Sequence, residues 1–442
     1  MNNIYSKRTL SSGVKVVMER MSHVRSVCVG IWVCSGSRNE DPRLSGISHF
    51  LEHMFFKGTK KRSARDIAVD MDSIGGEINA FTGKEGTTYY IKVLDEYIEP
   101  GVEILADIFL NSTFAEDEIE REKSVIREEI GMVEDTPDEY VHDLFNEKVW
   151  SGGGLGQPVL GTMETVNAIT RDDLFDYVKS NYGASNIIIS CAGSFDEDKL
   201  IGLLERYLGG LDGRVSSRLE AGTGIYKPER ISVKKDLSEV HICMAVPGIS
   251  QPSDERYVAL LANTVLGGGT SSRLFQEIRE NRGLAYSVFS YLSSYYETGI
   301  WALYAGTAKN HLAEVLEICT KELMGLKDSI SEDDLERAKR QVKGSVILGL
   351  ESTSRRMQNI ASQEIYYGRN ISPEETMRRI DGIRIDEARD FCAEHAGDMK
   401  DISLAVLGPV GKKEFAGMVR QTLQTADTAD KITSSRRGGR EA

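Results

Sequence analysis

The chain has 442 residues, with 54 Lys and Arg against 68 Asp and Glu, which gives a formal net charge of −14. This length fits two domains better than one, and a chain with 40% hydrophobic and 28% charged residues is globular rather than disordered. The acidic balance excludes a general nucleic-acid binder, because the phosphate backbone would be repelled. It favours cationic partners, although an acidic surface with no steering role accounts for the charge equally well.

The 6 cysteines form no Cys-x-x-Cys pair, and most of them lie in apolar stretches. They are interpreted as reduced core thiols in a reducing compartment, because a disulfide framework belongs to small, cysteine-dense secreted domains. The N-terminus lacks the basic and then apolar arrangement of a signal peptide. No apolar run reaches the roughly 18 residues of a membrane span. A cytoplasmic location is therefore expected.

Strand patterns dominate the first 40 residues, with candidate strands at Val14–Met18 and Val27–Cys34. From Gly46 to about Phe56 the apolar spacing becomes helical. The change from strand to helix places two histidines and a glutamate just inside a helix that packs on a sheet.

The next segments alternate between helix and hairpin. A helix capped by Ser63 is expected to about Ile74, followed by a hairpin from Glu77 to Val93. A long helical region is then predicted from Ile98 to Val149, with breaks near 111–115 and 135–136. The glycine-rich segment Trp150–Gly156 is expected to be an exposed, flexible loop.

The second half repeats the element order of the first. The strand Val240–Val246 is followed by a helix from Tyr257 to Leu266, and aligning Gly36 with Gly248 gives an offset of about 212 residues. The sequence therefore predicts an α+β protein of two similar, duplicated α/β domains, each a mainly antiparallel sheet packed with helices. The expected parts are a metal-binding domain, a linker, a domain without metal ligands and a disordered tail, over residues 1–215, 216–228, 229–424 and 425–442.

The motif His49-Phe-Leu-Glu52-His53 puts two imidazoles four residues apart on one face of a helix. Such a pair can chelate one divalent ion, and Zn²⁺ prefers nitrogen ligands in a tetrahedral set. Glu52 lies about 100° around the helix from His53, so it can face a water molecule in the site as a general base. H-x-x-E-H is the inverted zinc-peptidase pattern. The apolar flanks disfavour the alternative, a solvated charged helix face.

A catalytic zinc site needs a third protein ligand. Glu122 and Glu129 are seven residues apart in a segment with helical periodicity and therefore share a face. Glu120 and Glu128 are better explained as surface acids paired with neighbouring Arg and Lys.

These motifs together resemble the pitrilysin/insulinase family of zinc metallopeptidases, in particular its short bacterial branch, which is similar to the mitochondrial processing peptidase β subunit. The likeness extends over about residues 5–420, nearly the whole chain. Besides the metal motif and Glu129, it covers the segments Gly76–Thr82, Thr88–Tyr90, Leu155–Thr162, Ser271–Tyr286 and Leu348–Arg356.

The resemblance implies one Zn²⁺ per chain, with His49, His53 and Glu129 as ligands. It implies that Glu52 is the base that deprotonates the attacking water, and that Glu122 supports a ligand by hydrogen bonding.

The resemblance also implies how a peptide binds. Asn79, Ala80, Phe81 and Thr82 match the edge strand on which the family lays its substrate; an ordinary core hairpin is the alternative. Arg279 and Tyr286 match a pair that binds substrate and stabilises the tetrahedral oxyanion. A surface ion pair of Arg279 with Glu280 is the alternative for that pair.

A chain of this length has half the body of the long, fused family members. The Arg–Tyr pair should therefore reach the zinc site of another chain, in a homodimer or a heterodimer with a paralogue. The expected function is a zinc-dependent endopeptidase that works in a chamber formed by two chains, with basic, presequence-like peptides as suggested substrates. The alternative is a noncatalytic scaffold or partner subunit of a processing-peptidase-like complex.

One segment departs from the family pattern. Gly152–Gln157 stands where the family often has His-Pro ahead of Leu-Gly-Arg. No ligand is lost, but substrate preference in this region is left open.

Overall fold

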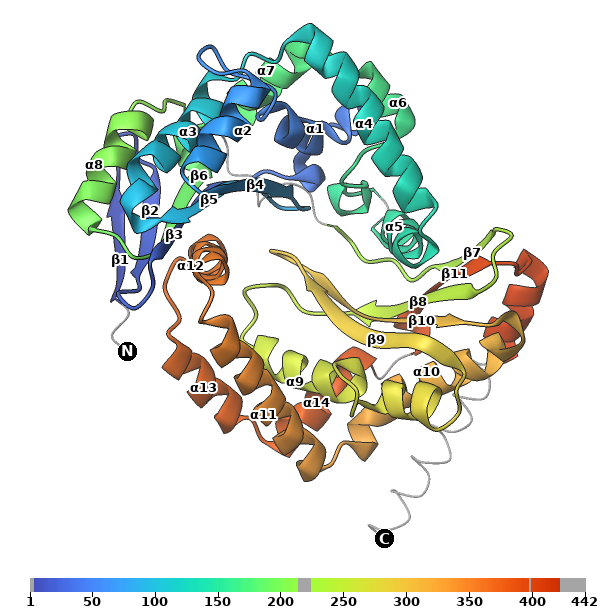
Figure 1. The fold of residues 1–442 in the computed structure, drawn as a ribbon. Coiled ribbons are helices and arrows are strands. Elements are labelled where there is room, and N and C mark those ends of the chain that lie inside the picture. Colours follow the sequence, from blue (N-terminus) through green and yellow to red (C-terminus); the bar gives the residue numbers. More distant parts are fainter. Residues whose placement is uncertain (1–3, 151, 214–223, 397–398, 422–442) are drawn as a thin grey trace. The chain divides into compact units, whose positions relative to one another are not determined.

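The structure is a computed structural model that describes residues 4–150, 152–213, 224–396 and 399–421. Its contacts divide the chain into two compact units (Figure 1). Unit 1 comprises residues 1–132, 153–223 and 347–372, and unit 2 comprises residues 133–152, 224–346 and 373–442. Each half of the chain therefore contributes one segment to the other unit. The linker predicted at 216–228 falls largely outside the described residues, and the tail predicted at 425–442 falls wholly outside them.

Unit 1 contains a sheet of six strands in the order β1-β2-β6-β3-β5-β4. All neighbours are antiparallel except the parallel pair β2 and β6. The strands are β1 (Ile4–Thr9), β2 (Lys15–Arg20), β3 (Ser26–Val33), β4 (Glu77–Thr82), β5 (Thr87–Leu94) and β6 (Ile187–Gly193). The middle strands are buried on both faces, which explains why β3 and β6 read as continuous apolar runs rather than as an alternating pattern.

Helices cover both faces of this sheet. One face carries the main core, to which Phe50, Leu51, Ile104 and Ile108 contribute. On the opposite face, Met357 and Ile360 of α12 pack against strand residues. The helices of unit 1 are α1 (Ile47–Met54), α2 (Ala64–Ser73), α3 (Ile98–Asn111), α4 (Glu116–Glu134, which ends in unit 2), α6 (Met163–Ala168), α7 (Arg171–Asn181), α8 (Glu197–Leu208) and α12 (Thr353–Tyr367).

Unit 2 contains a sheet of five strands in the order β7-β11-β8-β10-β9. Only the pair β7 and β11 is parallel. The strands are β7 (Arg230–Lys234), β8 (Val240–Pro247), β9 (Ala285–Ser294), β10 (Gly299–Thr307) and β11 (Ser403–Gly408). The helices are α5 (Pro137–Val149), α9 (Arg256–Gly267), the π-helix η6 (Phe275–Glu280), α10 (Leu312–Ser329), α11 (Glu332–Gly349), α13 (Pro373–Gly382), α14 (Ile385–Ala396) and a helical segment over residues 412–421.

The two sheets repeat one topology, which confirms the predicted fold class. Strands β2, β6, β3, β5 and β4 correspond in order and relative direction to β7, β11, β8, β10 and β9. The layers also correspond, because α12 covers the sheet of unit 1 much as α5 covers that of unit 2, where His142 of α5 contacts Cys243 of β8. Among the described residues, unit 2 has no counterpart of β1.

The segment Trp150–Gly156 corrects one expectation. Composition predicted an exposed loop, but Trp150 and Leu155 are both fully buried. Trp150 packs edge-on against the rings of Tyr226 and Tyr295. A Cβ on Gly154 would overlap the backbone of Arg38, so this glycine allows the two backbones to pack closely.

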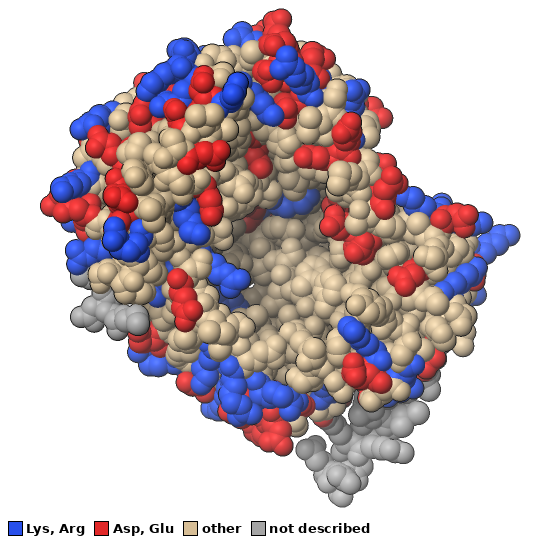
Figure 2. Space-filling model, in the orientation of Figure 1, with Lys and Arg blue, Asp and Glu red and all other residues tan. Residues whose placement is uncertain are grey.

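Charged side chains of both signs lie on the molecular surface (Figure 2). Figure 2 shows basic and acidic side chains interspersed on the face in view, although the net charge is −14. Five of the 6 cysteines, at positions 28, 191, 243, 319 and 392, are buried free thiols. None of the helices within the described ranges has the length and apolar character that crossing a bilayer requires.

Candidate active site

The helix α1, which carries the His-x-x-Glu-His motif, has an unusual start. Its N-cap is Gly46, with a φ of 96°, and a Cβ at this position would come within 2.6 Å of the Leu160 carbonyl oxygen. The buried carboxylate of Glu40 accepts hydrogen bonds from the backbone N–H groups of Gly46 and Ser48, at 2.7 and 2.8 Å. A carboxylate is favourable here because the first N–H groups of a helix have no partner within it. These contacts fix the direction in which α1 leaves the preceding loop.

Three candidate ligands converge at the middle of α1 and α4. The Nε2 atoms of His49 and His53 each lie 3.7 Å from Oε2 of Glu129. One ligand atom from each of the three residues lies within 4.8 Å of the others. The structure therefore brings together the three residues that the resemblance implied as metal ligands.

Glu122 lies directly behind His53. Its Oε2 is 2.9 Å from Nδ1 of His53, and its Oε1 is 2.7 Å from Nζ of Lys57. Although burial acts in the opposite direction, hydrogen bonds from His53 and Lys57 lower the pKa of Glu122. An ionised Glu122 holds the proton of His53 on Nδ1 and leaves the Nε2 lone pair facing the site.

His49 has no such neighbour. Its Nδ1 is buried without a hydrogen-bond partner among the described residues. Burial and the neighbouring His53 lower the pKa of His49 to about 4. The imidazole is therefore neutral at physiological pH, which is the form that binds a metal ion.

Glu52 lies on the same helix, beside these ligands but outside the set. The hydroxyl of Thr82, at the end of β4, donates a hydrogen bond of 2.6 Å to its Oε2. Burial raises the pKa of Glu52, and the Thr82 hydrogen bond opposes the increase. A half-buried carboxylate held on one oxygen has its other oxygen available to accept a proton.

The donor set fits Zn²⁺. Two imidazole nitrogens and one carboxylate oxygen leave a tetrahedral ion one open position, as catalytic zinc sites require. Oε2 of Glu129 faces both histidines and is buried without a hydrogen-bond partner among the described residues. An unpaired buried carboxylate oxygen is costly, and a cation at this point would remove that cost.

Strand β4 lies at the end of its sheet, next to this site. It pairs only with β5 among the described strands, and its side chains alternate between exposed and half-buried positions. Gly83 donates to the Gly86 carbonyl at the turn, so alternation along the antiparallel ladder directs the backbone N–H and C=O of Ala80 and Thr82 to the open edge. Phe81 packs edge-on against Trp32, and its side chain is 38% exposed. The Ala80 N–H donates a hydrogen bond of 2.8 Å to Oδ1 of Asn79.

Arg279 and Tyr286 lie in unit 2. The Arg279 guanidinium lies between two rings, 4.8 Å from the centre of Phe275 and 4.7 Å from that of Tyr286. Tyr286 is 79% exposed at the start of β9. Arg279 belongs to a π-helical turn, a local geometry common at functional sites. The half-buried Arg279 and the exposed Tyr286 therefore stack together, and Arg279 also stacks on Phe275.

Two supporting contacts were not expected from the sequence. Glu40 caps α1 from a loop, and Lys57 pairs with Glu122 from the residues just after α1. Glu40 carries no local signal that separates it from the surface acids around it. Lys57 could have been found from its position four residues after His53, which is one helical turn.

Sequence comparison identifies relatives over nearly the whole chain. Residues 15–163 match the family model described as Insulinase (Peptidase family M16), and residues 168–342 match the one described as Peptidase M16 inactive domain. The chain is 40% identical over 408 residues to the uncharacterized zinc protease YmxG of Bacillus subtilis, covering 91% of this chain and 98% of that protein. It is 37% identical over 416 residues to the uncharacterized zinc protease SCO5738 of Streptomyces coelicolor, covering 92% of this chain and 90% of that protein.

Solved structures show the same fold at lower identity. A peptidase M16 inactive domain from Pseudomonas fluorescens superposes with a TM-score of 0.86 at 17% identity, over 92% of this chain and 98% of that one. A protease from Helicobacter pylori superposes with a TM-score of 0.84 at 21% identity, over 92% of this chain and 100% of that one.

Proposed function

The chain belongs to the M16 insulinase family of peptidases, and on this premise we propose that it is a zinc-dependent endopeptidase whose centre is formed by α1, α4 and the edge of β4. The observation that carries the proposal is the convergence of His49, His53 and Glu129 within 4.8 Å, with Glu52 beside them on the same helix. Relatives at 37–40% identity are zinc proteases by name, which supports peptide hydrolysis as the reaction.

His49, His53 and Glu129 would hold one zinc ion per chain. When bound, Zn²⁺ acts as a Lewis acid that polarises a carbonyl group and lowers the pKa of water. Glu122 orients His53, and the buried contacts of α1 keep the two imidazoles in place before any substrate arrives.

Glu52 moves the protons. It takes a proton from the attacking water as the water adds to the peptide carbonyl carbon, and it delivers that proton to the amine nitrogen as the C–N bond breaks. Thr82 holds one oxygen of Glu52 in place. Since Thr82 also ends the substrate-binding strand, the base and the peptide are positioned by one element.

The peptide substrate would add to β4 as a further antiparallel strand. The outward C=O groups of Ala80 and Thr82 and the Thr82 N–H would bond its backbone, and the Ala80 N–H would join them by exchanging Oδ1 of Asn79 for a substrate carbonyl. Backbone bonding of this kind gives affinity with little demand on sequence. Asn79 and Phe81 alternate with them on the exposed face of β4 and would contact its side chains. Basic peptides are the favoured class, because the −14 charge attracts them.

Arg279 and Tyr286 would bind the substrate carbonyl and stabilise the oxyanion. We propose that they do so for the zinc site of a second chain, so that the active form is a homodimer, or a heterodimer with a paralogue, enclosing a chamber. The exposure of Tyr286 and the stacking of Arg279 on it support a role in contacts beyond their own unit.

Metal analysis combined with a peptidase assay tests the proposal. Purified protein should contain one zinc ion per chain by emission spectroscopy, cleave an internally quenched basic peptide, and lose that activity with a chelator. Restoring zinc should restore cleavage. A metal-free protein, or cleavage that a chelator does not affect, would contradict the proposal and favour the noncatalytic scaffold instead.

A further inference from the structure

Strand β7 lies at the end of the sheet in unit 2, and among the described strands it pairs only with β11, which leaves its other edge open. Leu404 donates to the Glu229 carbonyl at 2.9 Å, and Lys235 donates to the Gly408 carbonyl at 3.0 Å. Alternation along this parallel ladder therefore directs the backbone N–H and C=O groups of Arg230, Ser232 and Lys234 away from β11. Such unpaired groups are a template for a further strand.

Unit 1 shows what fills the corresponding position. There β1 pairs antiparallel with β2, the counterpart of β7. Two consecutive residues of β1 bond acids on opposite sides: Lys7 lies 2.6 Å from Glu364 of α12, and Arg8 lies 2.7 Å from Glu197 of α8. Just after β1, the Ser11 N–H donates to Glu205 of α8 at 3.0 Å. A basic strand thus lies between two helices that present acids to it.

The matching positions in unit 2 carry the opposite charge. Helix α8 begins four residues after β6 ends, and the helical segment 412–421 begins four residues after β11 ends. Glu197 and Glu205 therefore correspond to Lys412 and Arg420. On the other side of each sheet, Glu364 and Lys148 both lie eleven residues past the first residue of their helices, α12 and α5. The acid positions that contact β1 are thus occupied by cations beside β7.

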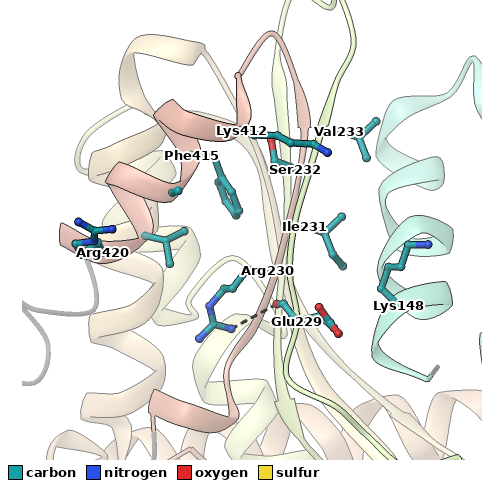
Figure 3. A pocket seen from close by; sticks show the side chains of 11 residues that line it. Lys148, Glu229, Arg230, Ile231, Ser232, Val233, Lys412, Phe415 and Arg420 are labelled. Carbon is teal, nitrogen blue, oxygen red and sulfur yellow. Dashed lines mark hydrogen bonds between the residues drawn. The ribbon is translucent and has the colours of Figure 1, made fainter. Parts of the chain in front are cut away.

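The edge of β7 borders a groove of about 740 Å³. Figure 3 shows the strand between α5, which carries Lys148, and the segment 412–421, which carries Lys412, Phe415 and Arg420. Four cations, at positions 148, 230, 412 and 420, line the groove with one carboxylate, Glu229. The groove is therefore basic within an acidic chain, and its volume is in the range of pockets that bind ligands.

Arg230 is short of a counter-charge. Its guanidinium donates to the backbone carbonyl of Glu229 at 3.4 Å, and no carboxylate side chain pairs with it among the described residues. Burial lowers its pKa. An anionic group entering the groove would supply the missing partner.

We propose that the β7 edge binds an extended acidic segment of another protein as an added antiparallel strand, in the position that β1 occupies in unit 1. Charged side chains on an edge strand also discourage aggregation, but that role does not require cations at the three helix positions that correspond to the acids around β1. The site is separate from the zinc centre and does not depend on its activity.

The chain supplies its own probe. A fluorescent peptide of residues 4–11 carrying Lys7→Glu and Arg8→Glu should bind the full chain, as measured by fluorescence anisotropy in the E52Q background so that neither peptide is cut. The unchanged 4–11 peptide is the matched control. The part of its binding that K412E removes, which leaves out any binding as a substrate at β4, should be at least about tenfold weaker, since its cations would face cations.

Two adjacent lysines locate the site. Lys412 lines the groove and Lys413 does not, and both are exposed on the same helical turn. K412E should remove the preference for the acidic peptide, whereas K413E should keep it. S232P, which removes one outward N–H, should weaken binding severalfold, and S232A should not.

Three results would overturn the proposal. The first is absence of binding by the acidic peptide. This result would also be obtained if another segment of the same chain already paired with the edge of β7. The second is K412E-sensitive binding of equal strength for the two peptides, or equal effects of K412E and K413E. The third is a K412E-sensitive dimer without peptide, which would make a second copy the occupant.

Discussion

Glu122 shows how much of the site depends on a residue that need not touch the metal. It bonds Nδ1 of His53 and Nζ of Lys57 and is almost fully buried. The sequence predicted that Glu122 and Glu129 share one face of a helix, because they are seven residues apart. Its role as support, rather than as ligand, was implied only by resemblance and is now given a geometric basis by the contact with His53.

The variant E122Q tests this role. It should fold and should bind zinc about 10- to 100-fold more weakly, because the amide cannot hold the His53 tautomer as a carboxylate does. Zinc affinity is measured by competition with a chromophoric chelator. E128Q, on the exposed side of the same helix, is the control and should match the wild type. Equal zinc affinity of E122Q and the wild type would show that Glu122 does not support the metal ligands.

Gly46 is the second residue on which the site depends. Its backbone is left-handed, and a Cβ would approach the Leu160 carbonyl to 2.6 Å. G46A should destabilise the protein by about 1 to 3 kcal/mol, since strain and overlap add. G75A is the control: Gly75 also has positive φ, at 60°, but open space around its Cβ position. Thermal unfolding that shows G46A no less stable than G75A would contradict this account.

At the scale of elements, periodicity predicted most of what positions the site. The spacing of Ile47, Phe50, Leu51 and Met54 predicted α1, and these four residues are fully buried. The hairpin of β4 and β5 was predicted over Glu77–Val93, and the two strands span Glu77–Thr82 and Thr87–Leu94. The segment 150–156 was misjudged because glycine composition cannot distinguish a mobile loop from one in which backbones touch.

The packing partners of two helices could not be predicted from local pattern. Helices α5 and α12 each pack in the unit formed mainly by the other half of the chain. This packing depends on contacts between residues far apart in the sequence, and hydrophobic periodicity carries no information about such contacts. The open edge of β7 is likewise visible only when the two sheets are compared.

The edge of β4 gives a prediction at this scale. A80P removes an outward N–H while the ladder to β5 is kept, so KM for a peptide substrate should rise severalfold. A80S keeps the N–H and should show the wild-type KM. Zinc content and melting temperature serve as checks on folding. An unchanged KM in A80P would mean that the substrate does not add to this strand.

At the scale of the whole molecule, the length of 442 residues divides into two units of one topology, of which one holds the zinc motif and the other Arg279 and Tyr286. The helix of unit 2 that corresponds to α1 is α9, where Leu261 to Val265 offer no ligand. Under the proposed function, duplication leaves one zinc site per chain, and Arg279 and Tyr286 of unit 2 would serve the site of a partner.

Co-expression of two inactive variants tests whether the pair acts between chains. E52Q lacks the base, and R279A/Y286F lacks the pair, so each homodimer should be nearly inactive. A mixed dimer isolated with two affinity tags would contain one complete site and should recover about half of the wild-type activity if the pair acts across a two-fold interface. Activity of the mixed dimer no higher than that of its parents would place the pair in its own chain's site, or outside catalysis.

The central claim is that Glu52 is the proton-transferring base of a zinc peptidase, and E52Q tests it most directly. Zinc content and cleavage of a quenched peptide are measured on the same sample, with E128Q as the control. E52Q should retain one zinc per chain and lose at least about 100-fold in kcat, because general acid–base catalysis contributes at least that much. Full zinc content together with wild-type turnover would contradict the claim.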